Sequence, residues 1–186
     1  MKRSERGFSL TEVMVATGVI ALIVCGAATA AVQTINVTKR SNDHMTTIRQ
    51  AQNAGYWISR DTQMAENVIV DDDPLTPEFL TITWTEWGYD IDSKYHSATY
   101  SFQDLSDGIG KLKRDHSIYD DAGVEIEKDT TLVAEYVYFD TDDPGNPNNT
   151  NASYQSPVLT LQTTASLGEA SETKEYQAWR RPNFSD

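Results

Sequence analysis

The sequence predicts an α+β fold in which one long N-terminal helix packs, along its second half, on an antiparallel β-sheet. Three observations support this fold class. An apolar run extends from Phe8 to Val32. A proline-free stretch from Thr34 to Ala65 carries small and apolar residues at helical spacing. Short segments with alternating apolar side chains follow Asp71, and their tight connections favour antiparallel pairing.

The apolar run has the length of a membrane-spanning helix. Its residues, at roughly 1.5 Å each, extend nearly 38 Å, which exceeds a bilayer core of about 30 Å. The basic residues Lys2, Arg3 and Arg6 precede the run, and Glu12 is the single acid within it. A carboxylate in such a run costs a few kcal/mol at the membrane centre, so Glu12 needs a partner or a function.

This N-terminus resembles that of type IV pilins and of the pseudopilins of type II secretion. The residues that carry the resemblance are Gly7-Phe8-Ser9-Leu10-Thr11-Glu12-Val13-Met14. The resemblance implies that a prepilin peptidase cuts after Gly7 and methylates the new N-terminal residue, Phe8. It also implies that Glu12 of one subunit neutralises the Phe8 amine of a neighbour. A buried pair that is satisfied only after assembly specifies register more than it adds stability.

Three other interpretations fit parts of the same stretch. A secretory signal also has a basic start and an apolar core, but no small-x-small cleavage site closes this run. A lipoprotein signal is approximated before Cys25, although Val24 stands where a small residue is expected. A simple membrane anchor explains the length of the run but not Glu12 or the Gly7–Phe8 junction.

The helix is expected to continue beyond the apolar run, from about Phe8 to Glu66. Small and apolar residues gather on one side of its second half, namely Ile48, Ala51, Gly55, Ile58, Thr62 and Ala65, and the band is widened by Ala54, Trp57, Met64 and Val68. We therefore expect a leader at residues 1–7, a transmembrane and assembly helix at 8–32, an amphipathic second half at 33–70 and a β-rich extracytoplasmic domain at 71–186.

Six or seven short strands are expected in that domain. Alternation is clearest at Leu80–Trp84, at Tyr95–Phe102 and at Leu132–Phe139. Further strands are expected at 158–162 and 176–179, and a hairpin turn at Asp120–Gly123. The aromatic residues are expected to form the core of the sheet and its contact with the helix.

Composition excludes some functions. The chain of 186 residues has a net charge of −13. Removing residues 1–7 would take away three basic residues and one acid, which leaves −15. Such an acidic chain is not expected to bind nucleic acid, because phosphate contacts need Lys and Arg. The basic N-terminus predicts that this end stays in the cytoplasm and that the acidic domain is exported. The single cysteine, Cys25, excludes an intramolecular disulfide.

No catalytic motif occurs in the sequence, so an enzyme is not expected. HExxH, GxSxG, CxxC and phosphate-binding glycine loops are all missing, and the three histidines are far apart along the chain. No cofactor is expected, with one exception. Asp140, Asp142 and Asp143 supply hard oxygen ligands of the kind that Ca²⁺ prefers, although the late glutamate of an EF-hand loop is missing. A solvated acidic loop is the alternative.

Shorter segments resemble minor pilins of the W type and pseudopilins of the J type. These are Ala54–Asp61, Leu112–Arg114, Val137–Phe139 and Pro157–Leu161. The resemblance implies a structural subunit, most simply a minor one, in the cytoplasmic membrane and then in a periplasmic or cell-surface filament. Its partners would be prepilin peptidase, membrane lipid, other subunits and the inner-membrane assembly platform. A major pilin and a membrane-anchored or lipidated extracytoplasmic binding protein are the alternatives.

Overall fold

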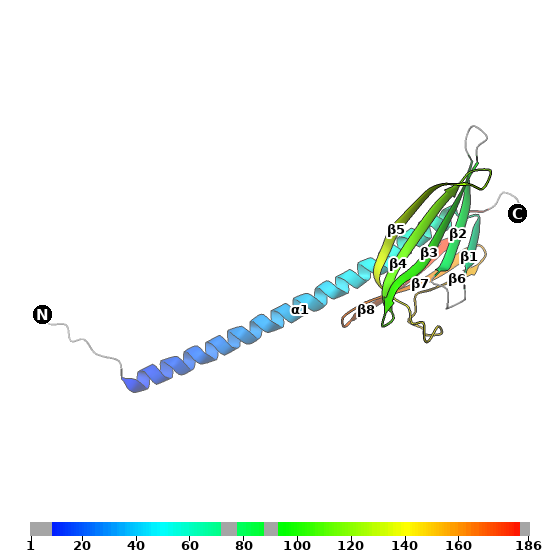
Figure 1. Ribbon diagram of the computed structural model, residues 1–186. Coiled ribbons are helices and arrows are strands. Elements are labelled where there is room, and N and C mark those ends of the chain that lie inside the picture. The colour runs from blue at the N-terminus through cyan, green and yellow to red at the C-terminus, as the bar shows by residue number, and fades with distance from the viewer. Residues whose placement is uncertain (1–8, 72–77, 88–92, 183–186) are drawn as a thin grey trace. The chain divides into compact units, whose positions relative to one another are not determined.

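The computed structural model describes residues 9–71, 78–87 and 93–182. It consists of one helix followed by a sheet, in the order α1 (Leu10–Met64), β1 (Asn67–Val70), β2 (Glu78–Trp87), β3 (Ser93–Ser106), β4 (Ile109–Tyr119), β5 (Glu125–Tyr138), β6 (Asn151–Gln155), β7 (Val158–Leu167) and β8 (Ala170–Trp179). The long helix packs, along its C-terminal part, on a curled antiparallel sheet (Figure 1). This confirms the predicted α+β architecture.

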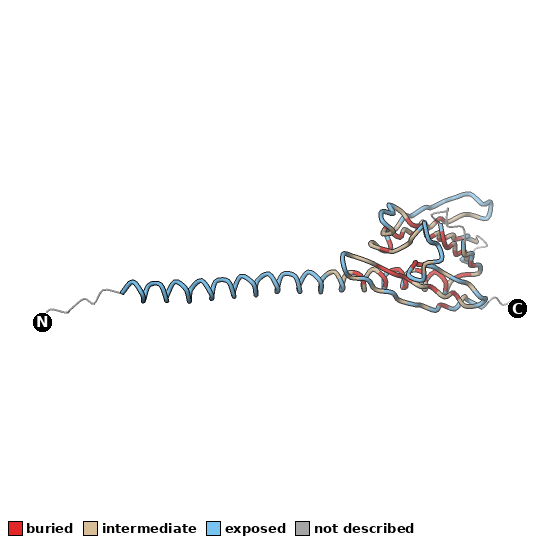
Figure 2. Tube along the Cα trace, turned by 90° about the horizontal axis from the view of Figure 1, so that it is seen from below, coloured by how far each residue is buried: buried red, intermediate tan, exposed pale blue. Residues whose placement is uncertain are grey.

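The chain divides into two compact units, which we describe separately. The first unit ends at Asn42, and its described part is the N-terminal portion of α1, where every residue is exposed (Figure 2). The second unit, Asp43–Asp186, contains the end of α1 and the sheet. The helix turns that pack on the sheet therefore belong to the same unit as the strands.

The sheet has the strand order β1-β2-β3-β4-β5-β7-β6, and β8 pairs with the other edge of β7. The pairing is continuous from β1 to β5, but β5 and β7 share a single paired position, Val137 with Ala165. On the inner face of the sheet, one row of side chains on adjacent strands consists of Leu80 of β2, Tyr100 of β3 and Arg114 of β4. This row places an arginine beside core residues, directly beneath the helix.

The hydrophobic core lies between the inner face of the sheet and the last turns of α1. Ala51, Ala54, Gly55, Ile58 and Thr62 of the helix are buried, as the band of small residues predicts. From the strands, Leu80, Ile82, Ala98, Tyr100, Leu112 and Val137 are at most 1% exposed. The predicted alternation in β2 and β3 is therefore confirmed.

The predicted helical segment 33–70 is wrong at its C-terminal end. The helix ends at Met64, and Asn67–Val70 form β1, which pairs with β2 through Val68 and Ile82. Three consecutive β-branched residues, Val68 to Val70, favour a strand, because they lose side-chain freedom in a helix. The β-rich part of the chain thus begins before residue 71.

Two further features of the sheet differ from the prediction. Strand β5 begins at Glu125, soon after the predicted turn, so it is longer than the segment expected at 132–139. A bulge interrupts its pairing with β4, since Gly110 faces Val137 whereas Leu112 faces Ala134, and Tyr136 has a φ of 59°. Strand β6 was not expected at all, because it directly follows a loop rich in Asn, Pro and Asp.

Candidate functional site

The described part of the N-terminal segment begins with a helix cap. Ser9 precedes the first helical residue, and its Oγ accepts a hydrogen bond from the backbone N–H of Glu12 at 3.3 Å. The Ser9 carbonyl accepts further bonds from the N–H groups of Glu12 and Val13. Serine at the cap and glutamate three residues later form the sequence of a capping box. Glu12 therefore lies in the first turn, where the helix dipole stabilises a carboxylate.

The helix surface beyond Glu12 is apolar and uncovered within this chain. Leu10, Met14, Leu22 and Ile23 are 65–80% exposed. The hydroxyls of Thr17, Thr29 and Thr34 donate to backbone carbonyls four residues earlier, at 2.9 Å, so these hydroxyls are satisfied within the helix. A contiguous apolar surface of this length indicates burial in lipid or against other helices.

Among the described residues, α1 is the one helix that is long and apolar enough to cross a membrane. Glu12 is exposed near its start, and no described residue forms an ion pair with it. The carboxylate is therefore available to a basic group from another molecule. Gly7 and Phe8, the predicted processing residues, lie outside the described residues. Cys25 is exposed and has a free thiol.

Comparison with known protein families agrees with this arrangement. Residues 2–28 match the prokaryotic N-terminal methylation motif. No curated protein and no solved structure matches the chain. The matched segment covers the basic start, the Gly7–Phe8 junction, Glu12 and most of the apolar run. The motif is a pilin-type prepilin signal, which implies processing by a peptidase, assembly with other pilin subunits and a structural role rather than catalysis.

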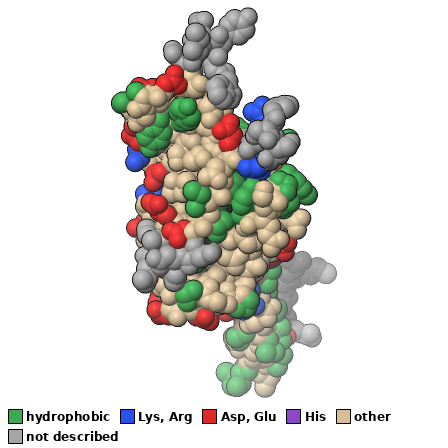
Figure 3. All heavy atoms as spheres, turned by 90° about the vertical axis from the view of Figure 1, so that its right-hand side faces the viewer, with side chains coloured by type: hydrophobic (Ala, Val, Ile, Leu, Met, Phe, Trp, Pro, Cys, Tyr) green, Lys and Arg blue, Asp and Glu red, His purple; other side chains and the backbone are tan. Residues whose placement is uncertain are grey.

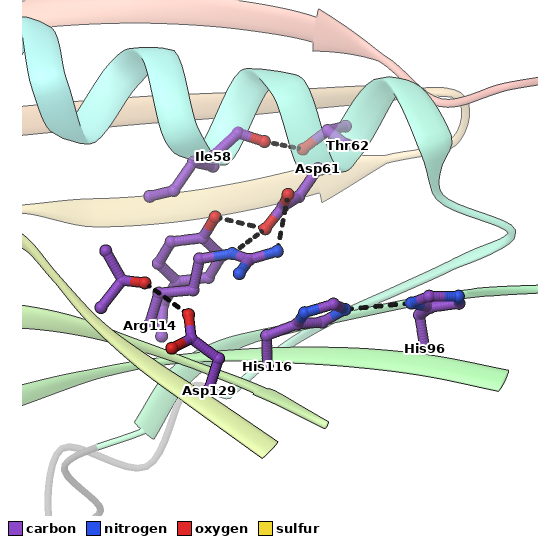
Figure 4. Close-up of polar contacts among 9 residues, drawn as sticks. Ile58, Asp61, Thr62, His96, Arg114, His116 and Asp129 are labelled. Atoms are coloured by element: carbon purple, nitrogen blue, oxygen red, sulfur yellow. Dashed lines mark hydrogen bonds and ion pairs between the residues drawn. The ribbon is translucent and has the colours of Figure 1, made fainter. Parts of the chain in front are cut away.

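A second polar cluster, which the sequence pattern did not predict, lies inside the Asp43–Asp186 unit. Asp61 of α1 is 1% exposed, and its Oδ2 accepts hydrogen bonds from the Tyr100 hydroxyl and from Nε of Arg114, both at 2.6 Å (Figure 4). Nη2 of Arg114 donates to Oδ1 at 3.1 Å. Helix α1 is thus connected to β3 and β4 through one buried carboxylate.

Burial and charge determine the protonation of this cluster. Burial raises the pKa of the Tyr100 hydroxyl well above its usual value, and the charge of Asp61 raises it further, so the group remains a hydrogen-bond donor. Burial alone would lower the pKa of Arg114, but its hydrogen bond to Asp61 and the charge of Asp61 outweigh that effect, and the pKa is raised. The cluster is therefore a neutral tyrosine bound to an ion pair.

The sequence did contain a signal for this cluster. Asp61 follows Ile58 by three residues and Ala54 by seven, which places it on the buried side of the helix. Arg114 follows Leu112 by two residues, which places both side chains on the same face of β4. A buried acid and a buried base on facing elements predict an ion pair, because either charge alone would be costly.

The acidic loop after β5 is organised by a buried asparagine. Asn149 is 1% exposed; its Oδ1 accepts from the N–H of Asp140 at 2.8 Å, and its Nδ2 donates to the carbonyl of Asp143 at 3.0 Å. Oδ1 of Asp140 accepts from the N–H groups of Asp142 and Asp143. Among the described residues no group of three His, Cys, Asp or Glu side chains is arranged to hold a metal. Calcium binding by Asp140, Asp142 and Asp143 stays a prediction.

Proposed function

We propose that this chain is a minor structural subunit of a type IV pilus or of a type II secretion pseudopilus. Prepilin peptidase cuts the precursor between Gly7 and Phe8 and methylates the new N-terminus. Before assembly the subunit waits in the cytoplasmic membrane with its N-terminus inside. It then enters a helical filament with other subunits, through the inner-membrane assembly platform. The observation that carries the proposal is the methylation motif at residues 2–28, followed by an uncovered apolar helix.

Glu12 supports the assembly role on physical grounds. Its carboxylate lies in the first turn of an apolar helix and is exposed in the single chain. Cleavage after Gly7 would create an amine at Phe8, and the Glu12 carboxylate of a neighbour would neutralise it in a filament core of low polarity. The pair would be complete only between subunits, so it would fix the axial register of assembly.

Intact mass of the membrane-extracted protein tests the processing step. The expected mass is that of the chain without residues 1–7 and with one added methyl group on Phe8. A Gly7→Leu variant should remain uncut, because the bulkier residue replaces the glycine that precedes the cut. A mass that corresponds to acylation at Cys25 would instead identify a lipoprotein, and normal cleavage of Gly7→Leu would exclude this site.

The minor role rests on charge and on the short resemblances to W-type and J-type subunits. At −15 per processed chain, a filament of this subunit alone would bring like charges within the screening length of about 8 Å. A few copies among less acidic subunits avoid that repulsion. Quantitative mass spectrometry of sheared filaments measures the fraction of the filament mass that this chain contributes. If this chain made up most of the filament mass, it would be a major pilin.

A further inference from the structure

A groove lies in the Asp43–Asp186 unit between the last turns of α1 and strands β2, β3 and β4. Its volume is about 710 Å³, within the range of ligand-binding clefts. The lining residues come from the helix, from the three strands and from the segment after β8: Trp57, Arg60, Met64, Trp84, Thr85, Glu86, His96, Arg114, His116 and Arg181. None of them belongs to the N-terminal motif.

One wall of the groove is a stack of three flat rings. Trp84, His96 and His116 have centroids 5.0–5.4 Å apart and are tilted by at most 13° from one another. Nδ1 of His96 lies 3.1 Å from Nε2 of His116 (Figure 4). Nε2 of His96 lies 3.1 Å from the Glu86 carboxylate. When both rings are neutral, His116 donates to His96 and His96 donates to Glu86. The wall is therefore formed without a ligand.

The lining also includes three arginines, Arg60, Arg114 and Arg181. The guanidinium groups of Arg60 and Arg114 lie 5.4 and 5.3 Å from the centre of the Trp57 ring, as in cation–π contacts. Arg114 is neutralised by the buried Asp61. Arg60 and Arg181 are exposed, and among the described residues neither forms an ion pair. These two guanidinium groups are available to a carboxylate from outside.

The groove is more basic than the rest of this acidic chain. Three of the eight arginines line it, in a chain with a net charge of −13. Glu86 is the only carboxylate among the described lining residues, and it is bonded to His96. Elsewhere acids are frequent, and Asp and Glu side chains extend along one side of the face drawn in Figure 3. A broad acidic partner would be repelled by such a surface, whereas a short acidic segment would meet only the groove.

We propose that this groove binds a short polypeptide segment of a partner protein that presents a carboxylate beside an apolar side chain. The carboxylate is held by Arg60 and Arg181, because the planar guanidinium group matches a carboxylate with two hydrogen bonds. The apolar side chain lies against the indole ring of Trp84, which offers flat apolar surface at little entropic cost. The site does not depend on the proposed filament role.

Binding of a labelled peptide to the full chain in detergent tests the proposal. The probe is a six-residue acetylated and amidated peptide that alternates phenylalanine and glutamate, and its control carries glutamine in place of glutamate. Fluorescence anisotropy should show saturable binding of the acidic peptide and at least tenfold weaker binding of the control. Equal binding of the two peptides would refute the role assigned to the carboxylate. If the acidic peptide did not bind at all, the proposed site would be refuted.

Matched variants locate the contact. Arg60→Gln with Arg181→Gln should weaken binding of the acidic peptide at least tenfold. The control, Arg49→Gln with Lys128→Gln, also removes two positive charges, from exposed positions of α1 and β5 outside the groove, and should change binding less than twofold. Glu86→Gln should strengthen binding, since it removes the one carboxylate among the lining residues that the structure describes. Unchanged binding by the double variant would refute the assigned residues. Equally tight binding of 3-phenylpropionate would show that the groove takes a small carboxylate and not a polypeptide.

Discussion

Single residues determine how the helix attaches to the sheet. Most of the buried positions of α1 are small or apolar, such as Ala51, Ala54 and Ile58, and such residues allow several registers of similar energy. Asp61 has partners at one register only, where Tyr100 and Arg114 meet it. A buried ion pair adds little net stability, but the wrong register would leave a charge buried without a partner. The cluster therefore specifies the docking position.

Replacing Asp61 alone should be strongly destabilising. In Asp61→Leu the Arg114 guanidinium stays buried without a counter-charge, and the expected loss is about 3–5 kcal/mol of unfolding free energy. The double variant Asp61→Leu with Arg114→Met removes both charges and should recover much of this loss. Denaturant unfolding followed by tryptophan fluorescence measures both, with Asp121→Ala in the exposed β4–β5 turn as the control. A loss below 1 kcal/mol in the single variant would contradict the proposed role.

His116 should make stability depend on pH. Burial lowers the pKa of His116, and the charge of Arg114 and the neighbouring His96 lower it further, against Asp61 and Asp129, which raise it. Glu86 faces the pair through His96. Because the unfolded chain binds the proton more readily, the contribution of His116 is complete above its unfolded pKa of about 6.5 and is lost as pH falls through its folded pKa.

His116→Gln tests this dependence. Melting temperatures of the parent and of the variant, measured between pH 7.5 and pH 5, should differ in their slope with pH. The parent should lose more stability towards acid pH than the variant does. Parallel curves would show that other groups account for the whole acid effect.

At the scale of the elements, close packing of α1 on β8 depends on Gly55. A Cβ built at this glycine would overlap the ring of Tyr176, which lies over the helix backbone. By contrast, nothing described lies within 4 Å of a Cβ built at Gly18 or Gly26. Gly55 therefore allows a close approach of helix and strand, rather than a special backbone conformation.

Gly55→Ala should destabilise the chain although alanine favours a helix. Alanine gains about 1 kcal/mol in helix propensity, but overpacking against Tyr176 costs typically 1–3 kcal/mol. The double variant with Tyr176→Leu should relieve the overlap and show the gain from propensity. Thermal unfolding of the two variants, with Gly26→Ala as the matched control, decides the question. A melting temperature above the parent's in Gly55→Ala alone would refute the close contact.

The sequence predicts most elements because alternation and helical spacing are local properties. Leu80, Ile82, Tyr100 and Phe102 are buried as their alternation indicates. The bulge at Tyr136 and the change from helix to strand after Met64 depend on pairing with distant strands, which a local pattern does not contain. Among the sites, Glu12 was recognisable from its setting in an apolar run. Asp61 was missed, because its partners are distant in sequence and it becomes informative only when paired with Arg114.

The loop from Asp140 to Asn151 offers a test of metal binding. Its carboxylates repel one another, and a divalent cation would relieve that repulsion. Binding only to the folded form would add about 2.7 kcal/mol of stability at a hundredfold excess over Kd. We therefore expect a higher melting temperature for the full chain in calcium than in chelator at equal ionic strength. Asp142→Asn with Asp143→Asn should abolish the difference. Equal melting temperatures would leave the loop held by Asn149 alone.

At the scale of the whole molecule, the apolar part of α1 and the acidic Asp43–Asp186 unit have opposite requirements. The first exposes a long apolar surface, which needs lipid or other helices around it. The second has a conventional core and is expected to be soluble in water. The proposed function satisfies both requirements before and after assembly. The same helix surface would contact lipid in the membrane and then neighbouring helices in the filament.

Glu12→Val separates membrane insertion from assembly. Valine removes the acid of the apolar run, so insertion should be unchanged or improved, and the amount of variant in the membrane fraction should match the parent. Assembly should fall at least tenfold, because the Phe8 amine of a neighbouring subunit would then lack a counter-charge in the filament core. Glu12→Asp keeps the charge on a shorter side chain and should restore part of the assembly. The measurement is the ratio of this chain in sheared filaments to that in membranes, and an unchanged ratio for Glu12→Val would refute the intersubunit pair.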